Sequence, residues 1–207
     1  VRLPVNGREN NNWVIKQALD IGVYGIMYPM INTVDDALNV MQASRYIHPK
    51  DAPDREPAGR RGFFPQHAAR YWGMTMTEYY DKADLWPHDP QGEILPVMQI
   101  ETEESVRNLR AILRAVPKPG VLLISEGDLS ASLGHKGLPH PEVNEAVQEA
   151  LKICKEFDVI AGTPQVTEQN LEKRIADGFR FMMLGLMRAQ ESESPLLKRA
   201  RELTGRG

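Results

Sequence analysis

The sequence has few cysteines and no long apolar run, and these shortages exclude several classes of protein. Its 207 residues include a single cysteine, Cys154, so no disulfide can form within the chain. This is typical of a reducing compartment and predicts a cytoplasmic location. No apolar run reaches the roughly 18 residues of a membrane-spanning helix. The net charge of −3 lacks the basic excess of nucleic-acid-binding proteins. We therefore expect neither a membrane nor a nucleic acid as a partner.

Other signatures are missing as well. No Gly-x-Gly-x-x-Gly motif follows an apolar run, which argues against a dinucleotide-binding fold. No lysine stands convincingly at the end of a predicted strand, which makes Schiff-base chemistry less favoured. The sequence begins Val1-Arg2-Leu3-Pro4, without an initiator methionine or a signal-peptide pattern.

Short apolar runs alternate with amphipathic stretches along the whole sequence. Strands are predicted at residues 1–3, 24–29, 94–100, 120–125, 159–163 and 179–184. Helices are predicted at residues 12–20, 33–46, 103–115, 141–157, 167–177 and 193–204. This alternation is typical of parallel βαβ units, and the continuous apolarity of the strands predicts burial on both faces.

Six such units in succession predict an α/β fold of the TIM (β/α)8-barrel type, in which this chain covers strands 3–8. A closed barrel needs eight strands and about 250 residues, so we expect a single domain, residues 1–207, that lacks two N-terminal units. The alternative is an open, doubly wound sheet of six strands. Residues 48–92 form a long insertion rich in proline, glycine, arginine and aromatics, with one short helix near residues 77–83. Connections of this length are usually functional or lie at interfaces.

Two acidic residues follow consecutive predicted strands. Glu101 comes directly after ILPVMQI, and Asp128 lies three residues beyond GVLLIS. In a parallel barrel the active site lies at the carboxyl ends of the strands, and neighbouring strands are about 4.8 Å apart. Two carboxylates there can share a cation, and such oxygen ligands select Mg²⁺ or Mn²⁺. Each acid alone also fits an ordinary loop or a helix cap.

The segments MQIETEESVRNL, GVLLISEGDLSASLG and HPEV resemble the HpcH/HpaI class II, metal-dependent pyruvate aldolases of the phosphoenolpyruvate/pyruvate-domain barrel superfamily. The VRLP segment and KQALDIGVYGIMYPMINT resemble earlier parts of the same barrel, and the resemblance extends from Val1 to about Met187. It implies two further βα units before VRLP, in agreement with the strand count.

The resemblance also implies roles for individual residues. Glu101 and Asp128 are similar to the two metal ligands, with Asp128 also beside the substrate. Gln99 is similar to the polar residue next to bound pyruvate, and the backbone N–H of Gly127 to the one that meets the substrate carboxylate. Arg2 is similar to the arginine that stabilises the enolate oxygen.

Asp20 is similar to the acid that orients a catalytic histidine. In the family that histidine belongs to the second βα loop, and none of the five histidines here occupies its position. The family's Gly-Pro-x-Asp is replaced by Ser125-Glu126-Gly127-Asp128, which adds a carboxylate beside the site.

The resemblance implies a lyase, namely a class II aldolase. Such an enzyme cleaves a 4-hydroxy-2-oxo acid into pyruvate and an aldehyde, or forms the acid from these two compounds. The cofactor implied is Mg²⁺ or Mn²⁺, with Co²⁺ as a further candidate, and the assembly a homo-oligomer, trimeric or hexameric. Two alternatives remain. One is an acyl-CoA lyase of the citrate lyase β and malyl-CoA lyase branch. The other is a catalytically incomplete barrel with a structural role.

Overall fold

The structure is a computed structural model, and it describes residues 1–4, 12–53, 55–137, 139–164, 166–184 and 194–205. Its centre is a parallel sheet of five strands in sequence order: β1 (Gly25–Tyr28), β2 (Leu95–Ile100), β3 (Val121–Ile124), β4 (Ile160–Thr163) and β5 (Phe181–Met182). Arg2 continues the same order, because it forms an isolated parallel bridge with Met27 of β1.

This strand order decides between the two predicted architectures. A doubly wound sheet reverses its strand order at a switch point, whereas a barrel adds each strand beside the last. No reversal occurs from Arg2 to β5. The prediction of a partial TIM barrel is confirmed, and the six expected strands correspond to five strands and one bridge. The last strand is shorter than expected, and residues 185–193 lie outside the described part of the chain.

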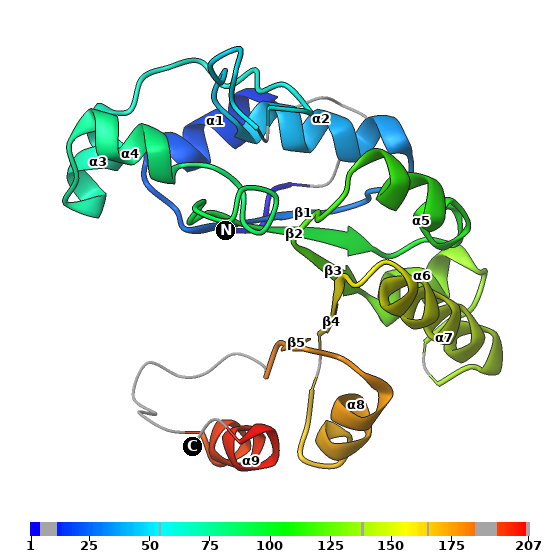
Figure 1. Ribbon diagram of the computed structural model, residues 1–207. Helices are drawn as coiled ribbons and strands as arrows, with labels where there is room; N and C mark the ends of the chain where they lie inside the picture. The colour runs from blue at the N-terminus through cyan, green and yellow to red at the C-terminus, as the bar shows by residue number, and fades with distance from the viewer. Residues whose placement is uncertain (5–11, 54, 138, 165, 185–193, 206–207) are drawn as a thin grey trace.

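The helices follow the sheet in an arc, from α1 and α2 past α5 and α7 to α8 (Figure 1). The longer ones are α1 (Asn12–Asp20), α2 (Val34–Ser44), α5 (Glu103–Ala115), α7 (Pro141–Glu156) and α9 (Pro195–Thr204). The shorter ones are α3 (Gln66–Trp72), α4 (Met76–Lys82), α6 (Glu126–Ser132) and α8 (Leu171–Asp177). In the described part of the chain, no helix combines the length and apolarity needed to cross a bilayer.

Helix starts are fixed by local hydrogen bonds. The Thr33 hydroxyl accepts from the backbone N–H of Asp36, and the Asp36 carboxylate accepts from the backbone N–H of Thr33. The same reciprocal cap joins Thr102 and Ser105 at the start of α5. Such caps satisfy amide groups that have no partner within the helix. The cap predicted at Thr33 is confirmed.

The side chains of each strand alternate between the two faces of the sheet, as the pleat requires. Met98, Ile100, Leu122 and Ile124 join the main core beneath the helices. Val97, Val121 and Leu123 face the other way and form a second, smaller apolar cluster with Phe181. By this alternation Gln99, Glu101 and Ser125 follow on the same inner face, at the carboxyl ends of β2 and β3. The sheet therefore places polar groups above an apolar floor.

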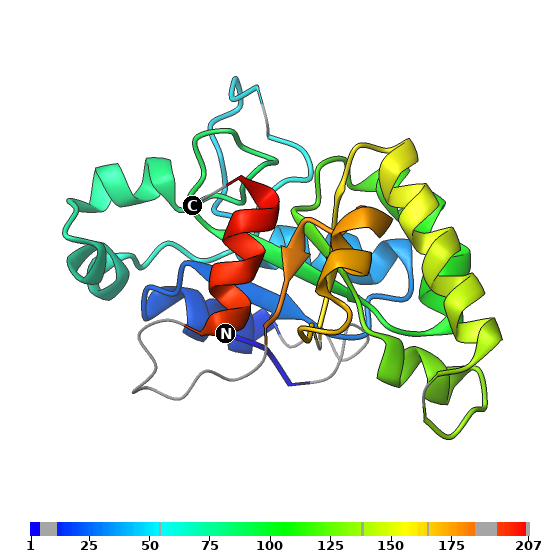
Figure 2. The ribbon, with the colours of Figure 1, turned by 90° about the horizontal axis from the view of Figure 1, so that it is seen from below.

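The insertion of residues 48–92 contains α3 and α4, which lie at the opposite end of the molecule from α6 and α7 (Figures 1 and 2). The helix expected at 77–83 is α4, and α3 was not predicted. Arg61 of this segment is 2% exposed; it donates to Asp20 at 2.9 Å and lies 4.2 Å from the centre of the Tyr46 ring. This arginine therefore holds the insertion against α1. The side chain of Arg61 is therefore buried and is not available on the surface of the protein.

Candidate metal and substrate site

Glu101 is fixed at the carboxyl end of β2 by hydrogen bonds to both of its carboxylate oxygens. Its Oε1 accepts from the backbone N–H of Met30 at 2.7 Å, and its Oε2 accepts from Nε2 of Gln99 at 2.8 Å. The residue is 2% exposed. A carboxylate held from two sides in this way is oriented before any ligand arrives.

Asp128 approaches Glu101 from the next strand. It lies in the first turn of α6, which begins directly after β3. Burial raises the pKa of Glu101, the hydrogen bond from Met30 opposes that rise, and the charge and hydrogen bonding of Asp128 add to it. The positive charge of Arg2 lowers the pKa, but the net direction is upward. Two carboxyl groups therefore lie close together in surroundings where water shields their negative charges only partly.

Such a pair fits a divalent cation. Like charges held together are unfavourable unless a proton or a cation lies between them, and hard cations prefer carboxylate oxygens. Glu101 and Asp128 are the residues that would hold it. With only two protein ligands, further coordination positions are left for water and substrate.

Gln99 lies beside the pair with an unused acceptor. Its Nε2 donates to Glu101 and to Oγ of Ser125, the latter at 3.1 Å. Its Oε1 is buried and has no hydrogen-bond partner among the described residues. A buried carbonyl without a donor is costly, so this atom favours a ligand or a water molecule that donates to it.

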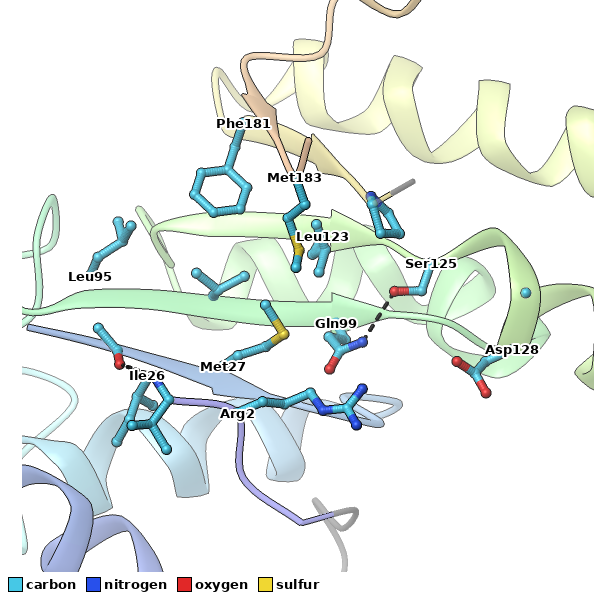
Figure 3. Close-up of a pocket in the computed structure, with 15 residues that line it drawn as sticks. Arg2, Ile26, Met27, Leu95, Gln99, Leu123, Ser125, Asp128, Phe181 and Met183 are labelled. Atoms are coloured by element: carbon cyan, nitrogen blue, oxygen red, sulfur yellow. Dashed lines mark hydrogen bonds between the residues drawn. The ribbon is translucent and has the colours of Figure 1, made fainter. Parts of the chain in front are cut away.

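These groups open into a cavity of about 650 Å³ on the inner face of the sheet. Arg2, Gln99, Ser125 and Asp128 gather at one end of it, while Leu123, Phe181 and Met183 line the rest (Figure 3). Gly127 also borders the cavity, and a Cβ built there would meet nothing within 4 Å. A polar end beside an apolar wall suits a small acid with a short carbon chain.

The structure brings together five of the six residues predicted for the site, namely Arg2, Gln99, Glu101, Gly127 and Asp128. Asp20 lies elsewhere. It ends α1, before the amino-terminal end of β1, and binds Lys16 and Arg61. Its predicted role with a histidine stays a prediction, because it does not border the cavity that Arg2, Gln99, Gly127 and Asp128 line.

Two contributors were not predicted, the Met30 amide and the Ser125 hydroxyl. A backbone donor leaves no trace in residue type, and a serine at a strand end is common. The additional acid, Glu126, turns away from the pair and binds Arg174 of α8 at 2.6 Å.

Comparison with known proteins places this arrangement in a family context. Residues 1–190 match the family described as HpcH/HpaI aldolase/citrate lyase. A 4-hydroxy-2-oxovalerate aldolase from Rhodococcus jostii (strain RHA1) is 33% identical over 174 residues, which are 84% of this chain and 60% of that protein. A hydroxypyruvate/pyruvate aldolase from Cupriavidus necator is 34% identical over 175 residues, 84% of this chain and 58% of that protein.

A solved structure agrees with the fold. The HpcH/HpaI aldolase/citrate lyase family protein from Burkholderia cenocepacia J2315 superposes with a TM-score of 0.73 at 27% identity, covering 99% of this chain and 71% of that one. The chain thus spans about 60% of the length of these two curated relatives.

Proposed function

Because the chain belongs to the HpcH/HpaI aldolase/citrate lyase family, we propose that it supplies the metal- and substrate-binding part of a class II aldolase acting on 4-hydroxy-2-oxo acids. The observation that carries this proposal is that Glu101 meets Asp128 and Gln99, which themselves line one cavity together with Arg2. The names of the two relatives support the substrate class, since both are aldolases and one acts on a 4-hydroxy-2-oxo acid.

Glu101 and Asp128 would hold Mg²⁺, Mn²⁺ or Co²⁺. A cation bound there supplies Lewis-acid stabilisation for the negative charge that develops on the 2-oxo group. The two hydrogen bonds to Glu101 keep its oxygens aimed at a fixed point.

In cleavage, a base takes the proton of the 4-hydroxyl, the bond between C3 and C4 breaks, and the aldehyde departs. The bonding electrons stay with the three-carbon fragment as the enolate of pyruvate, which then takes a proton at C3. Arg2 would place a fixed positive charge near the enolate oxygen, which is favourable because no solvent has to reorganise. The backbone N–H of Gly127 would donate to the substrate carboxylate, and Oε1 of Gln99 would accept from a hydroxyl or water.

The base is the part of this scheme that the described residues do not supply. No histidine borders the cavity in the described part of the chain. The family resemblance assigns the base to a histidine of the second βα loop, with Asp20 as its orienting acid. We therefore propose that the metal half of the apparatus resides here.

The test combines activity and metal binding on the same protein. After treatment with EDTA, the chain is assayed for pyruvate release from a series of 4-hydroxy-2-oxo acids, followed by NADH oxidation with lactate dehydrogenase. Mn²⁺ binding is followed by electron paramagnetic resonance. We expect Mn²⁺ binding, together with pyruvate release that is slow, because the described residues supply no base, and that depends on added Mg²⁺, Mn²⁺ or Co²⁺.

Undiminished activity in EDTA would contradict the proposal. A strict requirement for acetyl-CoA would favour the acyl-CoA lyase alternative. Mn²⁺ binding without pyruvate release from any of the acids would favour the catalytically incomplete barrel.

A further inference from the structure

A second group of metal-ligating side chains lies in the connection between α6 and α7. His135 and His140 stack with their ring centres 3.5 Å apart and their planes 20° apart. Nε2 of His135 lies 2.6 Å from Oε2 of Glu142. One ligand atom from each of the three residues lies within 4.8 Å of the other two.

This group is separate from the Glu101–Asp128 pair. Asp128 lies in the first turn of α6, and His135 follows the end of the same helix. The four helical steps from Asp128 to Ser132 alone span roughly 6 Å at 1.5 Å each, and neither Glu101 nor Asp128 belongs to the group of ligand atoms that lie within 4.8 Å of one another. A cation binds its ligands at only about 2 Å. One ion cannot serve both groups.

The donor types also differ between the two groups. Two imidazoles and a carboxylate are the ligand set of Zn²⁺ and its neighbours in the transition series, whereas two carboxylates favour Mg²⁺. We propose that His135, His140 and Glu142 form a second metal site that takes a Zn²⁺-type cation, with one coordination position left for water.

The geometry needs only small movements to accept the ion. Two ligand atoms about 2.1 Å from a tetrahedral metal lie roughly 3.4 Å apart. Nε2 of His135 and Oε2 of Glu142 would therefore move apart slightly as the ion replaces the proton between them. His140 accepts a weak bond of 3.3 Å from the backbone N–H of Glu142 through its Nδ1. Losing this weak hydrogen bond costs little. Nδ1 of His140 can therefore bind the metal itself, or it can carry the ring proton while Nε2 binds the metal.

Hydrogen bonds to α6 hold residues 135 and 137 of this connection in place. The backbone N–H of His135 donates to the carbonyl of Ser130 at 2.9 Å, and the Ser130 hydroxyl donates to the carbonyl of Gly137 at 2.9 Å. His140 is the N-cap residue of α7, and Glu142 lies in its first turn. The ion would therefore join the end of α6 to the start of α7. Because the side chain of His135 is 24% exposed and that of Glu142 54% exposed, the ion can enter from solvent.

The experiment uses the full chain without a polyhistidine tag, in an E101Q/D128N background that removes the other pair. After metal removal, Zn²⁺ is titrated by isothermal calorimetry, and Co²⁺ is added separately to follow the visible spectrum of the bound ion. We expect one Zn²⁺ per chain. Adding His135→Gln or His140→Asn should weaken Zn²⁺ binding by more than about tenfold, because loss of even an outer-shell partner reaches that scale.

The substitutions are chosen to keep the fold. Asparagine at position 140 retains a side chain that caps helices well, so a loss of binding in that variant reports on the imidazole. His67→Ala removes an exposed histidine of α3 and should leave Zn²⁺ binding unchanged. The proposal is overturned if the folded background variant binds no Zn²⁺, or if binding is undiminished after His135→Gln and His140→Asn. Circular dichroism confirms that each variant is folded.

Discussion

The Glu101 side chain is the residue on which the candidate metal site depends. Both of its oxygens are engaged by neighbours from different parts of the chain, Met30 after β1 and Gln99 within β2. Each hydrogen bond restricts the rotation of the Glu101 carboxylate, so less conformational entropy is lost when a ligand binds. The neighbouring Asp128 raises the pKa of Glu101, which burial already raises, so the pair is least favourable when both groups are charged and no cation is bound.

Glu101→Gln tests this arrangement. The amide keeps the size of the side chain but removes the charge, so we expect Mn²⁺ binding to be lost and kcat/KM for pyruvate release to fall by at least about 100-fold, because several kcal/mol of charge stabilisation depend on the metal. Glu126→Gln is the matched control, since Glu126 binds Arg174 and should leave Mn²⁺ binding intact. Equal loss in both variants would show a general effect of negative charge.

A second residue-scale prediction concerns the ion pair between Arg45 and Asp84. Burial tends to raise the pKa of Asp84, but hydrogen bonds from Arg45 and His48 outweigh it and hold the pKa below its ordinary value. The unfolded chain therefore binds this proton more tightly than the folded protein does. The contribution to stability is complete above about pH 4 and decreases as the pH falls below it.

Asp84→Asn should lower the free energy of unfolding by about 3–5 kcal/mol near pH 7, because it removes the carboxylate that forms a buried ion pair with Arg45. Urea denaturation at a series of pH values measures the difference, which should narrow below about pH 4. Asp81→Asn changes an exposed aspartate of α4 and should have little effect. A difference that stays constant down to pH 2 would contradict the assignment.

At the residue scale, the sequence was informative where a reactive side chain stands at a position that the fold makes functional, such as the end of a strand. An acid at the end of an apolar strand can be identified without a structure, and Glu101 and Asp128 were identified in this way. Gln99 was identified only through the family resemblance. The Met30 donor could not be identified, because any residue supplies a backbone N–H. For Asp20, the surrounding sequence resembles the family and predicts a role at the site. In the structure, however, its carboxylate forms ion pairs with Lys16 and Arg61.

At the scale of elements, long periodic segments were predicted well and short ones were not. The helices expected at 12–20 and 103–115 have the observed limits. The helix expected from 167 begins at Leu171, because Asn170 Oδ1 accepts from the backbone N–H of Thr167 and makes a turn first. The short α6 was not predicted, since three of its seven residues are glycine or serine and only Leu129 and Ser130 are buried. Packing therefore contributes more than intrinsic propensity to the stability of α6.

Two glycines with different conformations give an element-scale prediction. Gly127 lies inside α6 with open space around its Cα, whereas Gly73 caps α3 with a φ of 70°. Gly127→Ala should stabilise the protein by about 0.4–1 kcal/mol while raising KM for the oxo acid, because the methyl group enters the cavity. Gly73→Ala should destabilise it by about 1 kcal/mol, since alanine disfavours positive φ. Urea denaturation measures both, and changes of the same sign would contradict the assignment of backbone conformation.

At the scale of the whole molecule, the strands follow a curved path that does not close in the described part of the chain. Order and handedness of parallel βαβ units are general rules, so a parallel sheet could be predicted from the alternation of elements. The choice of a barrel over a doubly wound sheet also needed the family resemblance, because both folds have the same alternation. The position of the 48–92 insertion could not, because its contacts, such as Arg61 with Asp20, join segments far apart in sequence.

Self-association is the prediction that belongs to this scale. Trp13 of α1 is 64% exposed, Tyr71 of α3 is 72% exposed and Phe63, which precedes α3, is 59% exposed. Helices α1 and α3 are in contact. Exposed aromatics of this kind are enriched at subunit interfaces, and we expect a homo-oligomer, trimeric or hexameric by family resemblance. Tyr71→Glu should shift sedimentation velocity toward the monomer, whereas Gln148→Glu, which adds the same charge to an exposed position of α7, should not. A wild-type protein that sediments as a monomer at tens of micromolar would contradict the expectation.

The hydrogen bond from Met30 to Glu101 has a consequence for how occupancy of the site can be observed. The Met30 amide lies in the loop after β1, and its proton is held by an atom of the candidate ligand set. Its rate of exchange with deuterated solvent therefore depends on how firmly Glu101 is fixed. A cation that immobilises Glu101 should slow this exchange, while amides buried in α5 keep their rates. One backbone proton, followed by nuclear magnetic resonance, would thus report binding at the site without any substrate or turnover.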